Sequence, residues 1–199
     1  MPDPTRPALP MTHDPTTRLR TRALALLRPW ISLAAYQAAW WACVAAAARG
    51  RPLWGVAAVA AQLAWQLATS RKRSADGLLI LLAIAVGLMG DTALGRSGWL
   101  RYAAPGPLPG YAPAWILALW AQFGSILREP LRWLHGRPAL TAMLGGAGGA
   151  LSYAAAARMG ACQFVEPARA LGALVLAWAV MAPALMDVAR RLDSRLHSS

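Results

Sequence analysis

Six long apolar runs follow one another along the chain, separated by short segments that contain Arg, Lys, Pro or Trp. The runs are Trp30–Ala48, Pro52–Thr69, Gly77–Gly95, Tyr111–Leu127, Ala139–Ala157 and Ala170–Met186. Each is long enough for a transmembrane helix, which needs about 20 apolar residues with a range of roughly 17–25. Helices buried in a soluble protein would not be expected to stay this apolar six times over. The pattern predicts an all-α, polytopic membrane protein, a bundle of six transmembrane helices in one domain.

The segments outside these runs complete the predicted domain organisation. Residues 1–22 are rich in Pro, Thr and Arg without apolar periodicity, which predicts a disordered cytoplasmic tail. The helical domain then covers residues 23–190, and residues 191–199 form a C-terminal cytoplasmic tail. A signal peptide is the alternative interpretation of the first run, because Ala45, Ala46 and Ala47 offer a small-residue cleavage pattern. The long preceding segment and the Tyr, Gln and Trp residues within the run favour a retained helix.

The basic residues between the runs predict the orientation. Most of the 20 Lys and Arg residues lie in the N-terminal tail, the second and fourth connections and the C-terminal segment. These four segments share one side of the membrane if every run spans it. The positive-inside rule places that side, and both termini, in the cytoplasm. An odd number of helices would break the alternation, so the charges support six independently of hydropathy.

Composition excludes several classes of function. The chain is 57% hydrophobic and only 14% charged, whereas a soluble domain carries about 25% charged residues. Its net charge of +12 is typical of a nucleic-acid-binding protein, but the basic residues lie between apolar runs and not along one face. We therefore predict no nucleic-acid partner. Cys43 and Cys162 stand apart and all three His residues lie outside the runs, so the sequence predicts no metal site and no cofactor.

Asp91 is the most unusual residue of the apolar runs. Charged residues within a membrane are rare and usually face the interior of the bundle. Gly87 and Gly95 share its helical stripe and would let another helix approach closely. The predicted topology places a polar layer in the outer part of the bundle, with the candidate residues Asp91, Ser152, Tyr153 and Arg158. Proton handling or headgroup binding is the functional hypothesis. We favour the structural one, an ion pair or a hydrogen bond between helices, with Arg158, Arg49 or Arg96 as basic partners.

The connection 96–110 is the longest between two runs. It ends in Pro105-Gly106-Pro107-Leu108-Pro109-Gly110 and cannot be regular helix throughout. Its Trp99 and Tyr102 are residue types of the membrane interface, so we expect this loop to lie on the outer membrane surface.

A second polar layer is predicted in the inner half of the bundle. Its candidate residues are Gln37, Gln62, Gln66, Gln122 and Ser125. Amides at this depth need protein partners, because lipid supplies none. They either line a site for a polar ligand or headgroup or form hydrogen bonds between helices, and we favour the second interpretation.

Two ion-paired helix ends are expected on the cytoplasmic side. Glu129 lies among basic residues at the end of the fourth run, where a binding site for anionic lipid is the alternative. Asp187 is followed by Arg190 and Arg191 at helical spacing.

Four motifs together resemble an uncharacterised bacterial inner-membrane family, domain of unknown function 2878. They are 36–44 (YQAAWWACV), 90–94 (GDTAL), 113–120 (PAWILALW) with Phe123 and Trp133 after it, and 145–153 continuing to 158–161 (RMGA). The likeness covers about Trp30 to Met186. Genes of this family often neighbour genes resembling cyclopropane-fatty-acid synthases and flavin amine oxidases. The resemblance thus implies a bacterial inner-membrane location and a link to acyl-chain modification of membrane lipids.

We expect a lipid-related accessory protein that binds or presents a phospholipid or acyl chain. Its expected partners are membrane lipids and a membrane-bound or lipid-modifying protein. The alternatives are a small proton-coupled transporter that uses Asp91 and a structural assembly subunit. Catalysis by this chain alone is the less favoured hypothesis, because the runs contain a single acid and no His.

Overall fold

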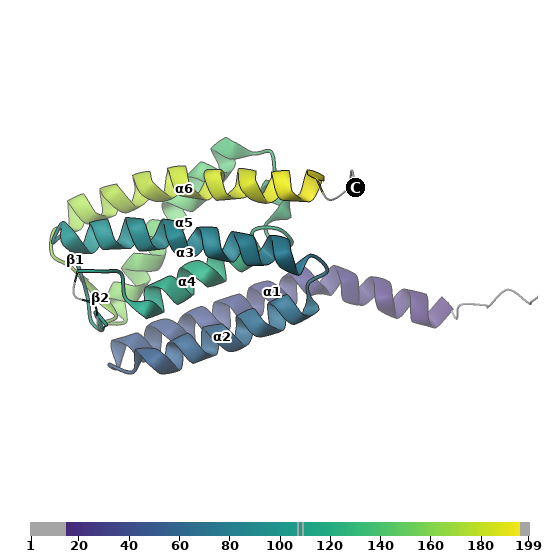
Figure 1. Cartoon of the computed structure of the whole chain (residues 1–199), viewed down its shortest axis with the longest axis horizontal. Coiled ribbons are helices and arrows are strands. Elements are labelled where there is room, and N and C mark those ends of the chain that lie inside the picture. Colours follow the sequence, from purple (N-terminus) through teal and green to yellow (C-terminus); the bar gives the residue numbers. More distant parts are fainter. Residues whose placement is uncertain (1–14, 107, 109, 196–199) are drawn as a thin grey trace, which may run out of the picture.

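The computed structural model describes residues 15–106, 108 and 110–195. This part of the chain forms six α-helices, a short 3-10 helix and two short strands. In chain order they are α1 (Pro15–Ala48), α2 (Pro52–Thr69), α3 (Arg73–Arg96), β1 (Leu100–Tyr102), α4 (Ala114–Ile126), η1 (Arg132–Leu134), α5 (Pro138–Arg158), β2 (Cys162–Phe164) and α6 (Pro167–Arg195). The helices run along one long axis, with both strands at one end of the bundle and the C-terminal end of α6 at the other (Figure 1).

Each predicted run corresponds to one helix, and the largest differences are at the chain ends. Helix α1 begins at Pro15 and extends beyond the bundle (Figure 1), so residues 15–22 are helical where the sequence predicted a disordered tail. Helix α6 likewise continues to Arg195. The Arg, Leu and Ala residues of these extensions have high helix propensity, which lets a helix continue past its apolar segment. The predicted tail residues 1–14 and 196–199 lie outside the described residues.

Three of the helices are long and apolar enough to cross a membrane: α1 from Leu27, α3, and α6. Helix α2 carries Gln62 and Gln66, and α5 is rich in glycine, which lowers the mean hydropathy of both. Helix α4 has 13 residues and stops before the Glu129-Pro130 pair, consistent with proline disfavouring helical backbone in the residue before it. The described part of the chain is thus a helical bundle with membrane-spanning character.

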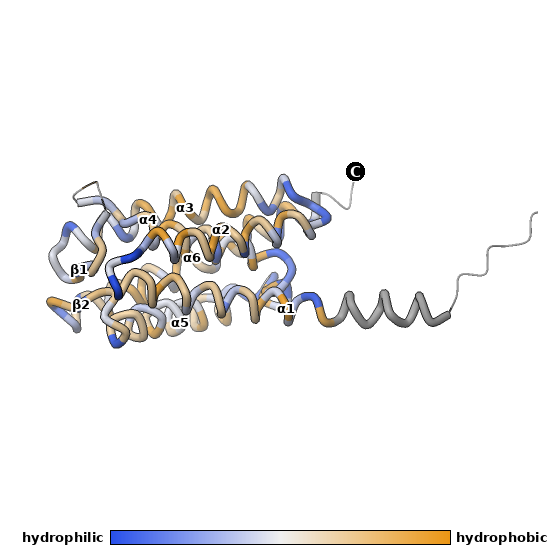
Figure 2. Tube along the Cα trace, turned by 90° about the horizontal axis from the view of Figure 1, so that it is seen from below, coloured by the Kyte–Doolittle hydropathy of each residue, from blue (hydrophilic) through white to orange (hydrophobic). Residues whose placement is uncertain are grey.

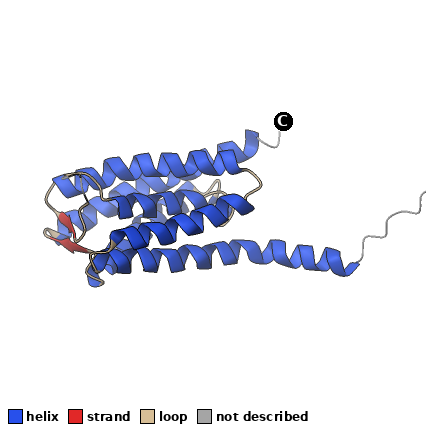
Figure 3. Ribbon diagram, turned by 60° about the horizontal axis from the view of Figure 1, so that its bottom comes forward, coloured by secondary structure: helices blue, strands red, loops and turns tan. Residues whose placement is uncertain are grey.

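Helix α4 occupies the middle of the bundle. It packs against α1, α2 and α3, while the pairs α1–α2, α3–α4 and α5–α6 make the most extensive contacts. Helices α1 and α5 make at most marginal contact with each other. Viewed from another side, the helices lie along the same axis and the ribbon of β1 and β2 closes one end (Figure 3). Between α1 and α5, one side of α4 is therefore not covered by a contact between helices.

Apolar side chains cover much of the outer surface. Large exposed examples are Leu53, Trp54, Leu81, Met89, Met143, Leu151, Leu176 and Val180. Along the chain, the most hydrophilic segments gather towards the two ends of the bundle and the apolar ones lie between them (Figure 2). A soluble monomer rarely exposes so much apolar surface, whereas lipid covers it at no cost.

Glycines set the closest helix contacts. A Cβ added at Gly55 of α2 would lie 2.7 Å from the Cα of Cys43 in α1. One added at Gly124 of α4 would lie 2.7 Å from the carbonyl oxygen of Leu79 in α3. Both obstacles are backbone atoms that cannot move aside singly, so these glycines allow the helices to pack at short distance, as small residues do in membrane bundles.

Strands β1 and β2 form a two-stranded antiparallel ribbon, called the ribbon below. Leu100 pairs with Phe164, Arg101 with Gln163 and Tyr102 with Cys162. The ribbon corrects the expectation for Tyr102, which was predicted to be an interfacial residue; the position of the loop 96–110 on the outer membrane surface stays a prediction. Leu100 is buried, and Tyr102 is half-buried and directed to the bundle. The pairing joins segments about 60 residues apart, and each strand has three residues, too few for alternation to be recognised in the sequence.

The opposite end of the bundle contains a buried ionic cluster that the sequence analysis did not identify. Arg128 donates from Nε to Asp76 at 2.6 Å and from Nη1 to Asp193 at 2.6 Å. Asp76 also accepts a hydrogen bond from the Ser70 hydroxyl, and Lys72 lies 4.0 Å from Asp193. Burial would lower the pKa of Arg128, but its bonds to both carboxylates raise that pKa above the ordinary value. The cluster ties together the start of α3, the end of α4 and the end of α6.

The two predicted helix ends both carry ion pairs. Glu129 lies 3.4 Å from Arg28 of α1, a partner from another helix in place of the neighbouring basic residues that the sequence suggested. Asp187 pairs with Arg190 at 2.7 Å and with Arg191 at 2.6 Å, which confirms the expected helix-spaced pairs.

Candidate functional site

Asp91 is buried in α3, with only 3% of its surface exposed, and accepts hydrogen bonds from three neutral side chains. The Tyr102 hydroxyl donates to Oδ1 at 2.6 Å, the Tyr153 hydroxyl donates to the same oxygen, and the Trp120 indole N–H donates to Oδ2 at 2.6 Å. These donors come from β1, α5 and α4. The carboxylate therefore joins four elements that are distant in the sequence.

Gly87, one turn before Asp91, makes room for one of these donors. A Cβ at Gly87 would overlap the indole ring of Trp120. The sequence analysis expected the Gly87–Gly95 stripe to admit a second helix. The structure shows that Gly87 admits an aromatic ring, while a Cβ at Gly95 would meet only a ring carbon of Tyr102 at 3.7 Å. The glycine thus positions the indole N–H on the carboxylate.

Trp120 stacks on Trp178 of α6, and the two rings form a wall inside the bundle. Their centroids are 4.5 Å apart with an interplanar angle of 12°. Phe123 meets Trp178 edge-on at 5.1 Å. A Cβ at Gly149 of α5 would overlap the Trp178 ring, so this glycine creates space for the second indole as Gly87 does for the first. A separate cavity lies on each side of the wall.

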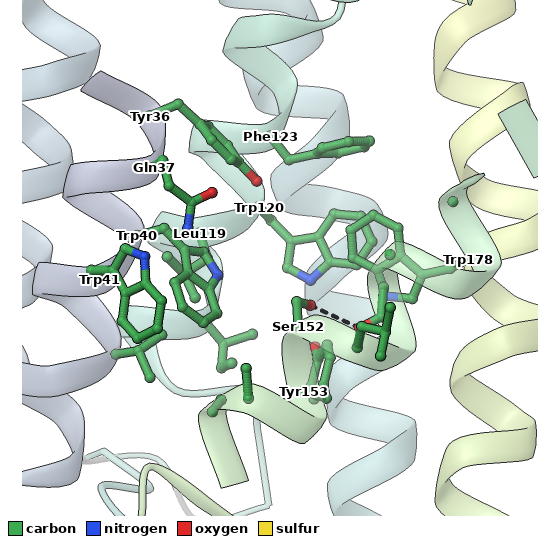
Figure 4. A pocket seen from close by; sticks show the side chains of 18 of the residues that line it. Tyr36, Gln37, Trp40, Trp41, Leu119, Trp120, Phe123, Ser152, Tyr153 and Trp178 are labelled. Carbon is green, nitrogen blue, oxygen red and sulfur yellow. Dashed lines mark hydrogen bonds between the residues drawn. The ribbon is translucent and has the colours of Figure 1, made fainter. Parts of the chain in front are cut away.

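The larger cavity, called the groove below, has a volume of about 440 Å³ and lies between α1 and α5, with α4 behind it (Figure 4). Its lining includes Tyr36, Gln37, Trp40, Trp41 and Val44 from α1, Trp115, Ile116, Leu119, Trp120, Phe123 and Ile126 from α4, Leu144, Gly145, Gly148, Gly149, Leu151, Ser152, Tyr153, Ala155 and Ala156 from α5, and Cys162 and Trp178. None of these side chains is charged. The volume lies within the range of about 300–1,000 Å³ typical of ligand pockets.

Two residues of α5 define the character of the groove. A Cβ at Gly148 would meet no atom within 4 Å, so this position opens into free space. Ser152 lies in the lining, but its hydroxyl donates to the carbonyl oxygen of Gly149 at 2.7 Å (Figure 4). The groove is thus mainly an apolar surface, with the Gln37 amide of α1 as an exposed polar group at its side.

The second cavity, of about 360 Å³, lies on the other side of the wall, between α3 and α6. Its lining is Gly90, Asp91, Ala93, Leu94, Ser97, Trp99, Trp120, Tyr153, Ala173, Leu174, Ala177, Trp178 and Met181. Of these residues Asp91 alone is charged. Trp120, Tyr153 and Trp178 belong to both linings, so these three side chains border both cavities.

The predicted outer layer is brought together only in part. Asp91 and Tyr153 are hydrogen-bonded, and Ser152 lies beside Tyr153 in the groove. Arg158 is exposed and makes no contact with the acid. Within the described ranges, no basic side chain lies at ion-pair distance from Asp91. The other two suggested partners use their guanidinium groups elsewhere, Arg49 on the carbonyl oxygen of Ala45 at 3.1 Å and Arg96 on that of Gly110 at 2.8 Å.

The predicted inner layer divides into two kinds of residue. Gln122 donates to the carbonyl oxygen of Tyr36 at 2.7 Å, and the Ser125 hydroxyl donates to that of Gln122 at 2.7 Å. Gln66 donates to the Ser125 carbonyl oxygen at 3.4 Å, so these contacts link α1, α2 and α4. Gln62 is buried, and neither polar atom of its amide has a partner among the described residues. Gln37 belongs to the groove instead.

Three aromatic residues at the centre of the site were not identified as site residues from the sequence. They are Tyr102, Trp120 and Trp178. Trp120 and Trp178 lie within their helices, away from the interface positions where tryptophan is usually found in membrane proteins. This unusual position could have marked them as site residues in the sequence. No sequence signal indicated that Tyr102 turns inward, because the ribbon that carries it depends on long-range pairing.

The ribbon residues beside Asp91 are held in their protonated forms. Burial, and then the Asp91 charge, raise the pKa of Tyr102 far above its ordinary value. Burial, and then Asp91, raise the pKa of the Cys162 thiol to about 12. A thiol with a raised pKa is a poor nucleophile. Among the described residues there is also no group of three or more His, Cys, Asp or Glu side chains that would hold a metal ion.

Fold and site together define the class of protein: a helical bundle with membrane-spanning helices, a hydrogen-bonded buried acid and an uncharged aromatic groove on its side. The chain belongs to the family described as protein of unknown function (DUF2878), whose model matches residues 29–184. This confirms the resemblance and the extent expected for it from the sequence. No curated protein and no solved structure gave a significant match.

Proposed function

We propose that the groove holds the acyl chain of a membrane lipid, and that the protein is an accessory factor that presents this chain to a partner enzyme. The observation that carries the proposal is the gap between α1 and α5, which leaves an uncharged, aromatic-lined cavity on the side of the bundle. A ligand for such a surface must itself be apolar, because any charge would enter without a partner.

The surroundings of the groove support a source of this ligand within the bilayer. Exposed apolar residues flank it, among them Trp41 on α1 and Leu144 and Leu151 on α5. These residues also belong to the groove lining, so the bilayer-facing surface continues into the cavity. A lipid chain can enter sideways without crossing water. The exposed amide of Gln37 is available to the polar ester region of the same lipid.

The groove proposal predicts a specific effect of filling it. Gly148→Leu places a side chain in open space inside the groove, without contact to neighbouring helices. We expect this change to reduce labelling by a fatty acid with a photoreactive diazirine in its chain by about tenfold, equivalent to roughly 1.4 kcal/mol of binding free energy. The measurement is the mass-spectrometric yield of labelled protein in lipid nanodiscs.

Gly172→Leu is the matched control. Gly172 is an exposed helical glycine of α6 whose added Cβ would also meet nothing within 4 Å, but it lies in neither cavity. Its labelling yield should equal that of the wild type. Equal labelling of the wild type and both variants would show that the fatty acid binds outside the groove.

We further propose that all six helices cross the inner membrane of a bacterium, with both termini in the cytoplasm. The entry of α1 into the bundle and the C-terminal end of α6 lie at the same end, opposite the ribbon (Figure 1), which supports an even number of crossings. Helix α4 is about 20 Å long at 1.5 Å per residue and would need its flanking turns to reach across a core of about 30 Å.

The proposed topology is tested by reporter fusion. A phosphatase that is active only outside the cytoplasm should be inactive when fused after Ser199 and active when inserted in the 103–110 loop. Activity of the Ser199 fusion would contradict the orientation.

The transporter and assembly-subunit hypotheses remain predictions, without an observation that favours either over lipid binding.

A further inference from the structure

The second cavity has a different chemistry from the groove. Its wall is apolar and aromatic, yet it contains the Asp91 carboxylate. A buried carboxylate is costly unless its charge is compensated. The three donors to Asp91 are neutral, and no described Lys, Arg or His is close enough to pair with it. The cavity therefore contains an acid whose charge the protein itself does not balance.

We propose that the second cavity binds the positively charged amino group of an amphiphilic amine, with the apolar part of that ligand between α3 and α6. Asp91 supplies the counter-charge. The stacked indoles of Trp120 and Trp178, with Trp99, supply aromatic surfaces. Aromatic rings attract ammonium groups through their negative faces, most strongly when water is excluded.

The three donors position the carboxylate for this role. Tyr102 and Tyr153 share Oδ1, and Trp120 takes one lone pair of Oδ2. A carboxylate has about four lone-pair sites in total. One site on Oδ2 is therefore not used by these donors, and Asp91 belongs to the cavity lining. The same donors hold the carboxylate in place when the cavity is empty.

The lining selects against other ligands. An anion would face Asp91 without a basic residue to bind it. A divalent metal ion would find a single carboxylate, because no second acid and no His belongs to the lining. An uncharged amphiphile would fill the apolar part but leave Asp91 unbalanced. A single ammonium group on an apolar chain satisfies both the charge and the surface.

The test uses n-octylamine, with n-octanol as its uncharged analogue of equal length, on the protein in lipid nanodiscs. Isothermal titration calorimetry, with empty nanodiscs subtracted, should show saturable amine binding at least about tenfold tighter than alcohol binding. Asp91→Asn should abolish this preference. Equal affinity for the two compounds, or no saturable amine binding, would overturn the proposal.

A second variant guards against a folding defect of Asp91→Asn. Gly90→Leu projects into the second cavity, where an added Cβ would meet only the flexible end of Met181 at 3.8 Å. It leaves Asp91 and its donors in place and should weaken amine binding by about tenfold, whereas Gly172→Leu should not change it. Unaltered binding to Gly90→Leu would place the amine outside this cavity.

The amine site and the acyl groove are separable by experiment. Gly90 does not line the groove, and Gly148 does not line the second cavity. Saturable amine binding by a protein whose acyl labelling is unchanged by Gly148→Leu counts against the proposed function alone. The reverse result counts against the amine site alone.

Discussion

Replacing Asp91 by Ala should lower the free energy of unfolding by about 3 kcal/mol or more, because it leaves the Tyr102, Tyr153 and Trp120 donors without an acceptor in a buried site. Hydrogen bonds to charged groups contribute about 1.5–3 kcal/mol each, although values within membranes are lower, near 0.6 kcal/mol on average. The loss should be measured by equilibrium unfolding in mixed micelles.

Two further variants give a scale for this loss of stability, one that removes a single donor to Asp91 and one that removes a different acid. Tyr102→Phe removes one of two hydroxyls from Oδ1 and should cost about 1 kcal/mol. Asp187→Ala removes a half-buried acid that pairs with two exposed arginines, so it should cost less than about 1 kcal/mol. If Asp91→Ala is no more destabilising than Tyr102→Phe, Asp91 does not hold the four elements together.

Replacing Arg128 by Ala should destabilise the other end of the bundle by about 3–5 kcal/mol, the usual cost of breaking a buried ion pair. The change removes the shared cation between Asp76 and Asp193, and leaves both carboxylates close to each other. It also removes the ion pairs that join the end of α4 to the start of α3 and to the end of α6. The same unfolding measurement applies, since the cluster is independent of Asp91.

Two companions make the Arg128 result interpretable. Arg132→Ala removes an exposed arginine of η1 and should change stability by less than about 0.5 kcal/mol. Adding Asp76→Asn to Arg128→Ala should recover part of the loss, because it removes the charge of the carboxylate that Arg128 Nε had paired with. If the double variant is less stable than Arg128→Ala alone, the balance of charge is not the way in which the cluster stabilises the protein.

Hydropathy predicted the helices because each of them contains a long apolar run that ends near charged, Pro or Trp residues. Residues 52–69 were predicted as a run and form α2 with the same bounds. The prediction was less accurate at the chain ends, where Pro15 to Arg22 is helical without being apolar. The Arg and Leu residues there favour a helix, which the prediction of disorder from composition did not take into account.

The site was harder to predict because its geometry depends on non-local contacts. Asp91 was recognisable as an expensive residue in an apolar run, and Tyr153 followed from its depth. The expected basic partner was wrong because aromatic donors, and not Arg158, surround the acid. Tyr102 could be placed only once β1 and β2 were seen to pair across two distant connections.

Glycine patterns were the most ambiguous signal. Small residues in a membrane helix indicate close packing but not the identity of what packs against them. Gly124 meets backbone, Gly87 meets an indole ring and Gly148 meets nothing within 4 Å. These outcomes correspond to a helix contact, a positioned donor and an open groove. Only the structure distinguishes them.

The most direct test of the acyl-chain groove is the position at which the photoreactive fatty acid labels the wild-type protein. Peptide mapping by mass spectrometry should find the label on the facing sides of α1 and α5, at lining residues that are buried in the bundle, such as Trp40 and Tyr153. Label spread over outward-facing residues that line neither cavity, such as Leu53 of α2 and Val180 of α6, would reflect ordinary lipid contact. That result would contradict a groove that binds an acyl chain.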